Sequence, residues 1–197
     1  MPVITALREQ SPHKGRQSRV EIQLDGRPWR LVPADAVVRA GLFVGRALDR
    51  DAARALGREL RRSQALSDAV RVLRHRDLSR RKLDERLQRR GARDSTRREA
   101  LDALERAGLV DDARVASGRA RSLAERGYGD AAIRFALEGE GIAAGLAEEA
   151  MASLDPERER AERLLRGGRD PKALRRLAAK GFDAETLADV VGFADEA

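Results

Sequence analysis

Apolar residues near the start of the chain alternate with polar ones. Val20, Ile22 and Leu24 form one alternating run, Trp29 and Leu31 belong to a second, and Asp-Gly separates the two. Alternation is the period of a half-buried strand, and Asp-Gly is a strong signal for a tight hairpin turn. We therefore predict a two-stranded β-hairpin. Because an isolated hairpin is marginal in water, its Trp29 face is expected to dock on the helices that follow.

The residues on either side of this hairpin show no alternation. Residues 1–18 contain Pro, Ser, Gln and scattered charges without any period, which predicts a mobile arm. After the hairpin, a short helix is expected over residues 34–40, and it should end before Gly41.

From residue 49 onward the apolar residues follow the helical period. Asp49 is a suitable N-cap for a long helix over about residues 50–75, which either runs continuously or bends near Ser63. The apolar positions that recur along it at helical spacing are Ala52, Leu56, Leu60, Leu66, Ala69, Val70 and Leu73.

A three-helix pattern then occurs three times. Its middle helix ends each time at a glycine, with apolar residues four and eight positions earlier on one helix face. These sets are Leu83, Leu87 and Gly91; Ile133, Leu137 and Gly141; and Ala173, Leu177 and Gly181. Another short helix is expected after each glycine, at about 95–107, 144–153 and 183–194. Helices this short are marginal alone, so the units are expected to stack on one another.

The predicted fold is therefore mainly α: an elongated array of three tandem three-helix repeats with a small N-terminal β-hairpin. The expected divisions are a mobile arm at 1–18, the hairpin and short helix at 19–48, the long helix and first repeat at 49–110, the second repeat at 111–155, and the third at 156–197. The third repeat is degenerate, because Gly167-Gly168 and Pro171 interrupt its start and Ala173 replaces a large apolar residue.

The composition argues against several classes of function. There is no cysteine, and His13 and His75 lie far apart, so neither disulfides nor a metal site are expected. The chain has no phosphate-binding G-x-x-x-x-G-K-[ST] loop, no G-x-S-x-G elbow and no H-E-x-x-H pair. No apolar run approaches the roughly 20 residues of a membrane span. We expect a cytoplasmic, non-enzymatic protein without a cofactor, a small-molecule substrate or a membrane contact.

Charge is distributed unevenly along the chain. Residues 54–98 contain 16 basic and 6 acidic side chains, whereas residues 128–155 contain 1 basic and 6 acidic ones, within a net charge of +7. A basic stretch beside an acidic one suits a polyanion or a charge-patterned partner. A solvated helical face is the alternative explanation of the basic stretch.

Ten residues are candidates for contact with such a partner. Arg74, Arg81 and Arg89 are favoured within the basic stretch, which also contains Lys82 and Arg93. The full candidate set is Arg71, Arg74, Arg76, Arg80, Arg81, Arg86, Arg89, Arg90, Arg126 and Tyr128. Tyr128 is equally well explained as an aromatic that packs between repeats.

The Gly-Leu-Val-Asp-Asp element at 108–112 has a structural explanation. Gly108 would close a helix, Leu109 and Val110 would enter the core, and Asp111 or Asp112 would cap the next helix. A catalytic or metal-binding role for the two carboxylates is disfavoured, because no histidine or further carboxylate cluster joins them in sequence.

These motifs together resemble the RecX family of RecA modulators. The pattern ALxxLxxRxxSxxxLxxxLxxxG corresponds here to residues 69–91, and Ala107-Gly108-Leu109-Val110-Asp111-Asp112-Ala113-Arg114 follows it. Arg126-Gly127-Tyr128-Gly129 and Gly141-Ile142 continue the match, which covers about residues 18–195.

The resemblance implies a regulator that binds RecA recombinase filaments on DNA, in recombination and the SOS response, and is expected to be monomeric. The basic segment 54–98 would face DNA or an acidic filament surface. One alternative is an autonomous, sequence-indifferent nucleic-acid-binding protein. A helical adaptor for another assembly is a further alternative.

Overall fold

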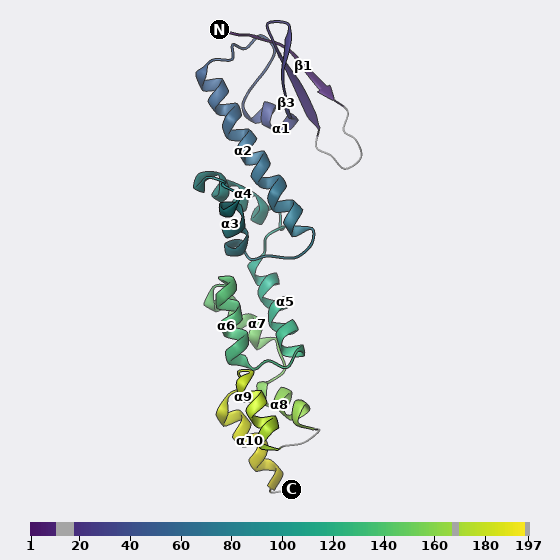
Figure 1. Cartoon of the computed structure of the whole chain (residues 1–197), viewed down its shortest axis with the longest axis vertical. Helices are drawn as coiled ribbons and strands as arrows, with labels where there is room; N and C mark the ends of the chain where they lie inside the picture. Colours follow the sequence, from purple (N-terminus) through teal and green to yellow (C-terminus); the bar gives the residue numbers. More distant parts are fainter. Residues whose placement is uncertain (11–17, 167–169, 196–197) are drawn as a thin grey trace. The chain divides into compact units, whose positions relative to one another are not determined.

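The computed structural model describes residues 1–10, 18–166 and 170–195, with side chains described up to residue 192. The chain forms two compact units. The first unit contains Met1–His75 and Asp84–Arg106, and the second contains Arg76–Leu83 and Ala107–Ala197. Each unit is described by itself below, and Figure 1 identifies the elements of both.

A three-stranded antiparallel sheet opens the first unit. Its strands are β1 (Ile4–Gln10), β2 (Arg19–Leu24) and β3 (Arg27–Pro33), in the order β1-β2-β3. Asp25 and Gly26 join β2 to β3 with φ angles of 48° and 79°. Positive φ at both central residues is typical of the tight hairpin turn that Asp-Gly favours. The predicted hairpin is confirmed.

The prediction of a mobile arm over residues 1–18 is wrong for Ile4–Gln10, which pair with β2 as strand β1. The register shifts between Ile4 and Ala6, as in a β-bulge. A bulge breaks the alternation of apolar and polar residues, so the period of this strand is hidden in the sequence. The remainder of the expected arm, residues 11–17, lies outside the described residues.

The buried face of the sheet is not the Trp29 face. Trp29 is 43% exposed, whereas Ile22 and Val32 are fully buried. Those two residues belong to one core with residues from α1 (Ala34–Arg39) and α2 (Arg50–Leu73). The expectation that Trp29 docks on the helices is therefore wrong, and the opposite face of β3 does so instead.

The long helix agrees with the prediction. The Asp49 side chain caps α2 by accepting a hydrogen bond from the Ala52 amide at 2.7 Å. Beyond the sheet, α2 packs against α4 (Asp94–Arg106). The helix between them in sequence, α3 (Arg80–Arg89), contributes its residues from Asp84 onward to the first unit.

Two three-helix groups make up most of the second unit. The first group is α5 (Asp112–Glu125), α6 (Asp130–Glu140) and α7 (Ala144–Ala152). The second is α8 (Glu157–Leu165), α9 (Pro171–Ala179) and α10 (Ala184–Asp195). Each group has its own apolar core, in which the predicted positions Ile133, Leu137 and Leu177 are buried.

The glycines predicted to end the middle helices adopt left-handed conformations. Gly91, Gly141 and Gly181 have φ angles of 79°, 77° and 82°. Pro171 does not interrupt the third middle helix, because it occupies the first turn of α9, where its missing amide costs nothing. The preceding Gly167-Gly168 lies outside the described residues.

A close backbone contact joins the two groups of the second unit. The Gly129 amide, just before α6, donates a hydrogen bond to the Lys180 carbonyl at 2.9 Å. The next amide, of Asp130, donates to Glu157 Oε1 at 2.6 Å, and Glu157 is the first residue of α8. The start of a middle helix is thus held by the glycine turn and the first helix of the following group.

The start of α3, which belongs to the second unit, makes two contacts at equivalent positions, although a side-chain hydroxyl replaces the backbone amide as the first donor. The Ser79 hydroxyl caps α3 and donates to the Glu140 carbonyl at 2.6 Å. The Arg80 amide donates to Asp112 Oδ1 at 2.7 Å, and Asp112 is the first residue of α5. Glu140 precedes Gly141 as Lys180 precedes Gly181, so the two junctions use equivalent positions.

We predict that Gly129→Ala lowers the free energy of unfolding by about 3 kcal/mol, the upper range for forcing an extra methyl into a packed site. A Cβ at this position would lie 2.3 Å from the backbone of Gly181. The matched control is Gly139→Ala within α6, where nothing lies within 4 Å of the added Cβ. It should raise stability by about 1 kcal/mol through helix propensity. Urea unfolding followed by circular dichroism measures both, and equal effects would contradict the contact.

Candidate functional site

The ten candidate residues are divided between the two units. Arg71, Arg74, Arg86, Arg89 and Arg90 belong to the first unit, where they lie along or just after α2 and α3. The other five belong to the second unit: Arg76, Arg80, Arg81, Arg126 and Tyr128. The ten candidates therefore form two separate sets in the structure, and each set has its own surroundings.

Two of the first unit's candidates share one carboxylate. Arg90 Nη1 lies 2.6 Å from Asp68 Oδ1, and Arg71 Nη2 lies 3.7 Å from the same oxygen. A single negative charge cannot neutralise two guanidinium groups, so this pair keeps a net positive charge. The excess that the sequence predicts is present locally around Asp68.

Arg74 and Arg89 are the most available candidates of the first unit. Arg74 follows α2, Arg89 ends α3, and both are exposed. Within the part of the chain that the structure describes, neither side chain forms a hydrogen bond or an ion pair. Arg86 differs, because it is half-buried and its Nε atom is buried without a hydrogen-bond partner. Arg74 and Arg89 are therefore the better placed for an external partner.

Arg80 and Arg81 take part in the packing of the second unit. Arg80 is half-buried, and its backbone amide binds Asp112. The Arg81 side chain lies against Gly141 so closely that a Cβ there would overlap it. Arg76, by contrast, is exposed and lines a shallow hollow of about 360 Å³ along α5, together with Arg114, Arg119 and the acidic Asp77 and Glu140.

Two cationic side chains lie close to the ring of Tyr128. The Arg126 guanidinium carbon lies 5.5 Å from the ring centroid and Lys180 Nζ lies 5.2 Å from it, distances at which cation–π attraction operates. The ring is half-buried and packs on the core of the α5–α7 group. These contacts favour the interpretation of Tyr128 as an aromatic that packs between repeats.

Sequence reasoning missed Arg160, a buried arginine of α8 that is 5% exposed. It donates from Nη1 to the Tyr128 carbonyl at 2.8 Å and from Nε to the Asp155 carbonyl at 3.0 Å, and it pairs with Asp130. Its guanidinium carbon lies 5.8 Å from the centroid of the Phe182 ring. The only sequence signal was its position beside the apolar Ala161 in an otherwise charged helix.

The Gly-Leu-Val-Asp-Asp element serves the fold, as expected. Asp111 caps α5 by accepting from the Arg114 amide at 2.9 Å, Gly108 has a φ of 67°, and Val110 is buried. Leu109 does not enter the core as predicted, since it is 45% exposed. Across residues 1–10, 18–166 and 170–195, no group of three or more metal-ligating side chains could hold an ion. No described helix is long and apolar enough to cross a membrane.

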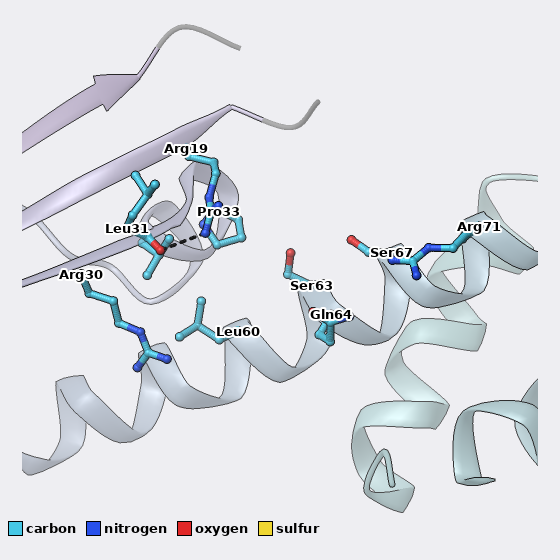
Figure 2. A pocket seen from close by; sticks show the side chains of 10 residues that line it. Arg19, Arg30, Leu31, Pro33, Leu60, Ser63, Gln64, Ser67 and Arg71 are labelled. Carbon is cyan, nitrogen blue, oxygen red and sulfur yellow. Dashed lines mark hydrogen bonds between the residues drawn. The ribbon is translucent and has the colours of Figure 1, made fainter. Parts of the chain in front are cut away.

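A basic groove in the first unit was also missed. It lies between β3 and α2 and has a volume of about 600 Å³ (Figure 2). Two of its arginines, Arg19 and Arg30, come from strands and lie outside the basic stretch of the sequence. Arg71 of α2 lines the groove as well.

Comparison with known proteins gives one family match and two similar curated relatives. The family model for the RecX second three-helix domain matches residues 111–151. A regulatory protein RecX of Chromohalobacter salexigens is 38% identical over 139 residues, covering 66% of this chain and 91% of the relative. A regulatory protein RecX of Halorhodospira halophila is 34% identical over 146 residues, covering 68% and 91%.

Two solved structures share the fold. A crystal structure of regulatory protein RecX aligns with a TM-score of 0.81 at 21% identity, covering 96% of this chain and 100% of the other. A crystal structure of RecX from Lactobacillus salivarius aligns with a TM-score of 0.61 at 20% identity, covering 70% and 98%. At these identities the structures support the fold alone.

We predict that Arg160→Met lowers the free energy of unfolding by about 3 kcal/mol, because it leaves the buried partners of a charged group unpaired. Arg163→Met is the matched control in the same helix, since Arg163 pairs with Asp155 through side chains that are 49% and 56% exposed. That loss should stay below about 1 kcal/mol. Chemical denaturation of the full chain measures both; similar losses for the two variants would rule out a structural role for Arg160.

Proposed function

Because the chain belongs to the RecX family of regulatory proteins, we propose that it binds RecA recombinase filaments on DNA and restrains them. Binding would lower the filament's ATP hydrolysis, strand exchange and co-protease activity, in recombination and the SOS response. The proposal describes a non-enzymatic regulator that acts in the cytoplasm as a monomer. The family relationship supports the regulatory role. The exposed side chains of Arg74 and Arg89 support an anionic partner.

The observation that carries the proposal is the exposed positive charge where α2 and α3 end. Arg74 and Arg89 are exposed there, and their side chains make no hydrogen bond or ion pair within the described residues. Arg71 and Arg90 nearby in sequence share the single carboxylate of Asp68. Guanidinium groups without internal partners retain their capacity to bind phosphates or carboxylates.

The acidic second repeat is not expected to contact phosphates. Glu138, Glu148 and Glu149 are exposed on α6 and α7, and Arg134 alone pairs with Glu148, at 3.0 Å, among the described residues. A surface with this charge would be repelled by phosphates. We therefore propose that the DNA or acidic filament surface is contacted through the basic segment 54–98, and that the second repeat meets other parts of the filament.

The first test is the rate of ATP hydrolysis by RecA on single-stranded DNA as the protein is titrated. Binding to the same DNA is measured in parallel without RecA. Inhibition at concentrations that leave naked DNA almost unbound would support regulation directed at RecA. Inhibition only where naked DNA is saturated would instead favour the alternative, an autonomous sequence-indifferent nucleic-acid-binding protein. No inhibition would reject the proposal.

We predict that reversing Arg74, Arg81 and Arg89 to Glu raises the concentration needed for half-inhibition by about tenfold or more, since each lost exposed contact is worth up to about 1 kcal/mol. Because Arg81 also packs against Gly141, the double variant Arg74→Glu/Arg89→Glu is measured beside it. The charge-matched control reverses the exposed Arg8, Arg27 and Arg39. An equal loss of inhibition in the control would reject these residues as the contact, provided that circular dichroism stays unchanged.

A further inference from the structure

The groove between β3 and α2 combines an apolar floor with a basic rim. Leu31, Val32 and Pro33 of the sheet and Leu60 of the helix provide the apolar part. Arg19 and Arg30 stand on the sheet side and Arg71 on the helix side (Figure 2). Among the described residues that line the groove, none carries a carboxylate.

The three guanidinium groups of the groove have few partners within the protein. Arg19 is held at the groove by a hydrogen bond from Nη2 to the Leu31 carbonyl at 3.1 Å. Arg30 is exposed, and its side chain has no hydrogen bond or ion pair within the described residues. Arg71 has a side chain 66% exposed, and its contact with Asp68 is a long one of 3.7 Å. The positive charge of the groove is therefore largely uncompensated.

Ser63 provides an independent sign of a ligand. It is only 4% exposed, yet its hydroxyl makes no hydrogen bond in the part of the chain that the structure describes. Figure 2 shows this hydroxyl on the side of α2 that faces the sheet, with the Ser67 hydroxyl one turn further along. The Ser63 oxygen is not among the described polar atoms that are fully buried without a partner, so it remains accessible from the groove that the residue lines. Serine is also a poorer helix former than alanine, so helix propensity does not explain a serine here.

The donors fit phosphate oxygens. A guanidinium group presents paired N–H donors that match two phosphate oxygens, and hydroxyl groups donate to the same oxygens. The three arginines come from β2, β3 and α2, and positive charges on separate elements suit an extended chain of anions. Arg74 continues the helix face of Ser67 and Arg71 by its spacing of seven and three residues, which lengthens the positive surface.

We propose that this groove binds the phosphodiester backbone of a single-stranded nucleic acid. The near-complete burial of Ser63 favours a single strand, because the wide cylinder of a duplex would reach only the rim. None of the ten lining residues is aromatic, so bases have no stacking platform and binding is indifferent to sequence. An acidic peptide fits less well: β3 is an edge strand, and Pro28 and Pro33 remove amide donors that an added peptide strand would use.

The test is the affinity of the full chain for a fluorescent deoxythymidine oligomer, measured by anisotropy across a range of salt concentrations. Arg30→Glu should weaken binding by about tenfold and reduce the salt slope by about one, as expected for a lost phosphate contact. Ser63→Ala should weaken it by about fivefold, the effect of one hydrogen bond, with little change in slope. Arg39→Glu is the control: it makes the same charge change at an exposed position outside the groove, and should cost less than about twofold.

The melting temperature of the Ser63→Ala variant shows whether this hydroxyl binds the ligand or stabilises the fold. Because Ser63 has no hydrogen bond to lose within the described residues, Ser63→Ala should leave the melting temperature unchanged or raise it. A lower melting temperature would indicate that the hydroxyl serves the fold, and would remove it from the proposal. Equal losses of affinity for Arg30→Glu and Arg39→Glu would overturn the groove as the site.

Competitors identify the ligand. A matched duplex that binds as tightly, with the same dependence on Arg30, would overturn the choice of a single strand. Polyglutamate that displaces the oligomer more effectively than an unlabelled oligomer does would assign the groove to an acidic peptide. Inorganic phosphate should compete only at concentrations where ionic strength alone acts. RecA is absent throughout, so failure here leaves the proposed regulation of filaments untouched.

Discussion

Hydrogen bonds from helix N-terminal amides to carboxylates hold successive helical groups of the second unit together. Glu157 accepts from the Asp130 amide at the start of α6 through one oxygen and from the Asp183 amide before α10 through the other. Amides at a helix N-terminus have no partner within their own helix, and the positive end of the helix dipole attracts the negative charge. One side chain thereby satisfies two helix ends. Asp112 accepts from one such amide, that of Arg80 at the start of α3.

Much of the helical fold could be predicted because its determinants are local. Asp49 and Ser79 cap helices as their positions indicate, and Gly91, Gly141 and Gly181 adopt the expected left-handed conformation. The strand β1 could not be predicted, because a bulge near Ile4 disrupts its alternation. The side of β3 that packs on the helices was wrong for a related reason: a register shift between Ile22 and Gln23 changes which residues face each other.

The candidate site was predicted less completely, because charge along a sequence does not specify partners in space. Arg74 and Arg89 are exposed, whereas Arg86 is half-buried, although all three lie in the same basic stretch. Arg19 and Arg30 come from strands outside that stretch and meet α2 only through the tertiary fold. Ser63 gave no signal at all, since a serine within a helix is ordinary until its burial and missing hydrogen bond are known.

The junctions in the second unit have a consequence for how such a protein can evolve. The Gly129 amide and the Lys180 and Glu140 carbonyls are main-chain atoms, which every residue type supplies. The joint therefore constrains a carboxylate at the start of one helix, the Ser79 hydroxyl at one of the junctions and small residues at the closest contacts. It leaves the outward-facing side chains almost unconstrained. Duplicated modules joined in this way can acquire opposite charges while their connection stays the same, so each can specialise for a different ligand without redesign of its neighbours.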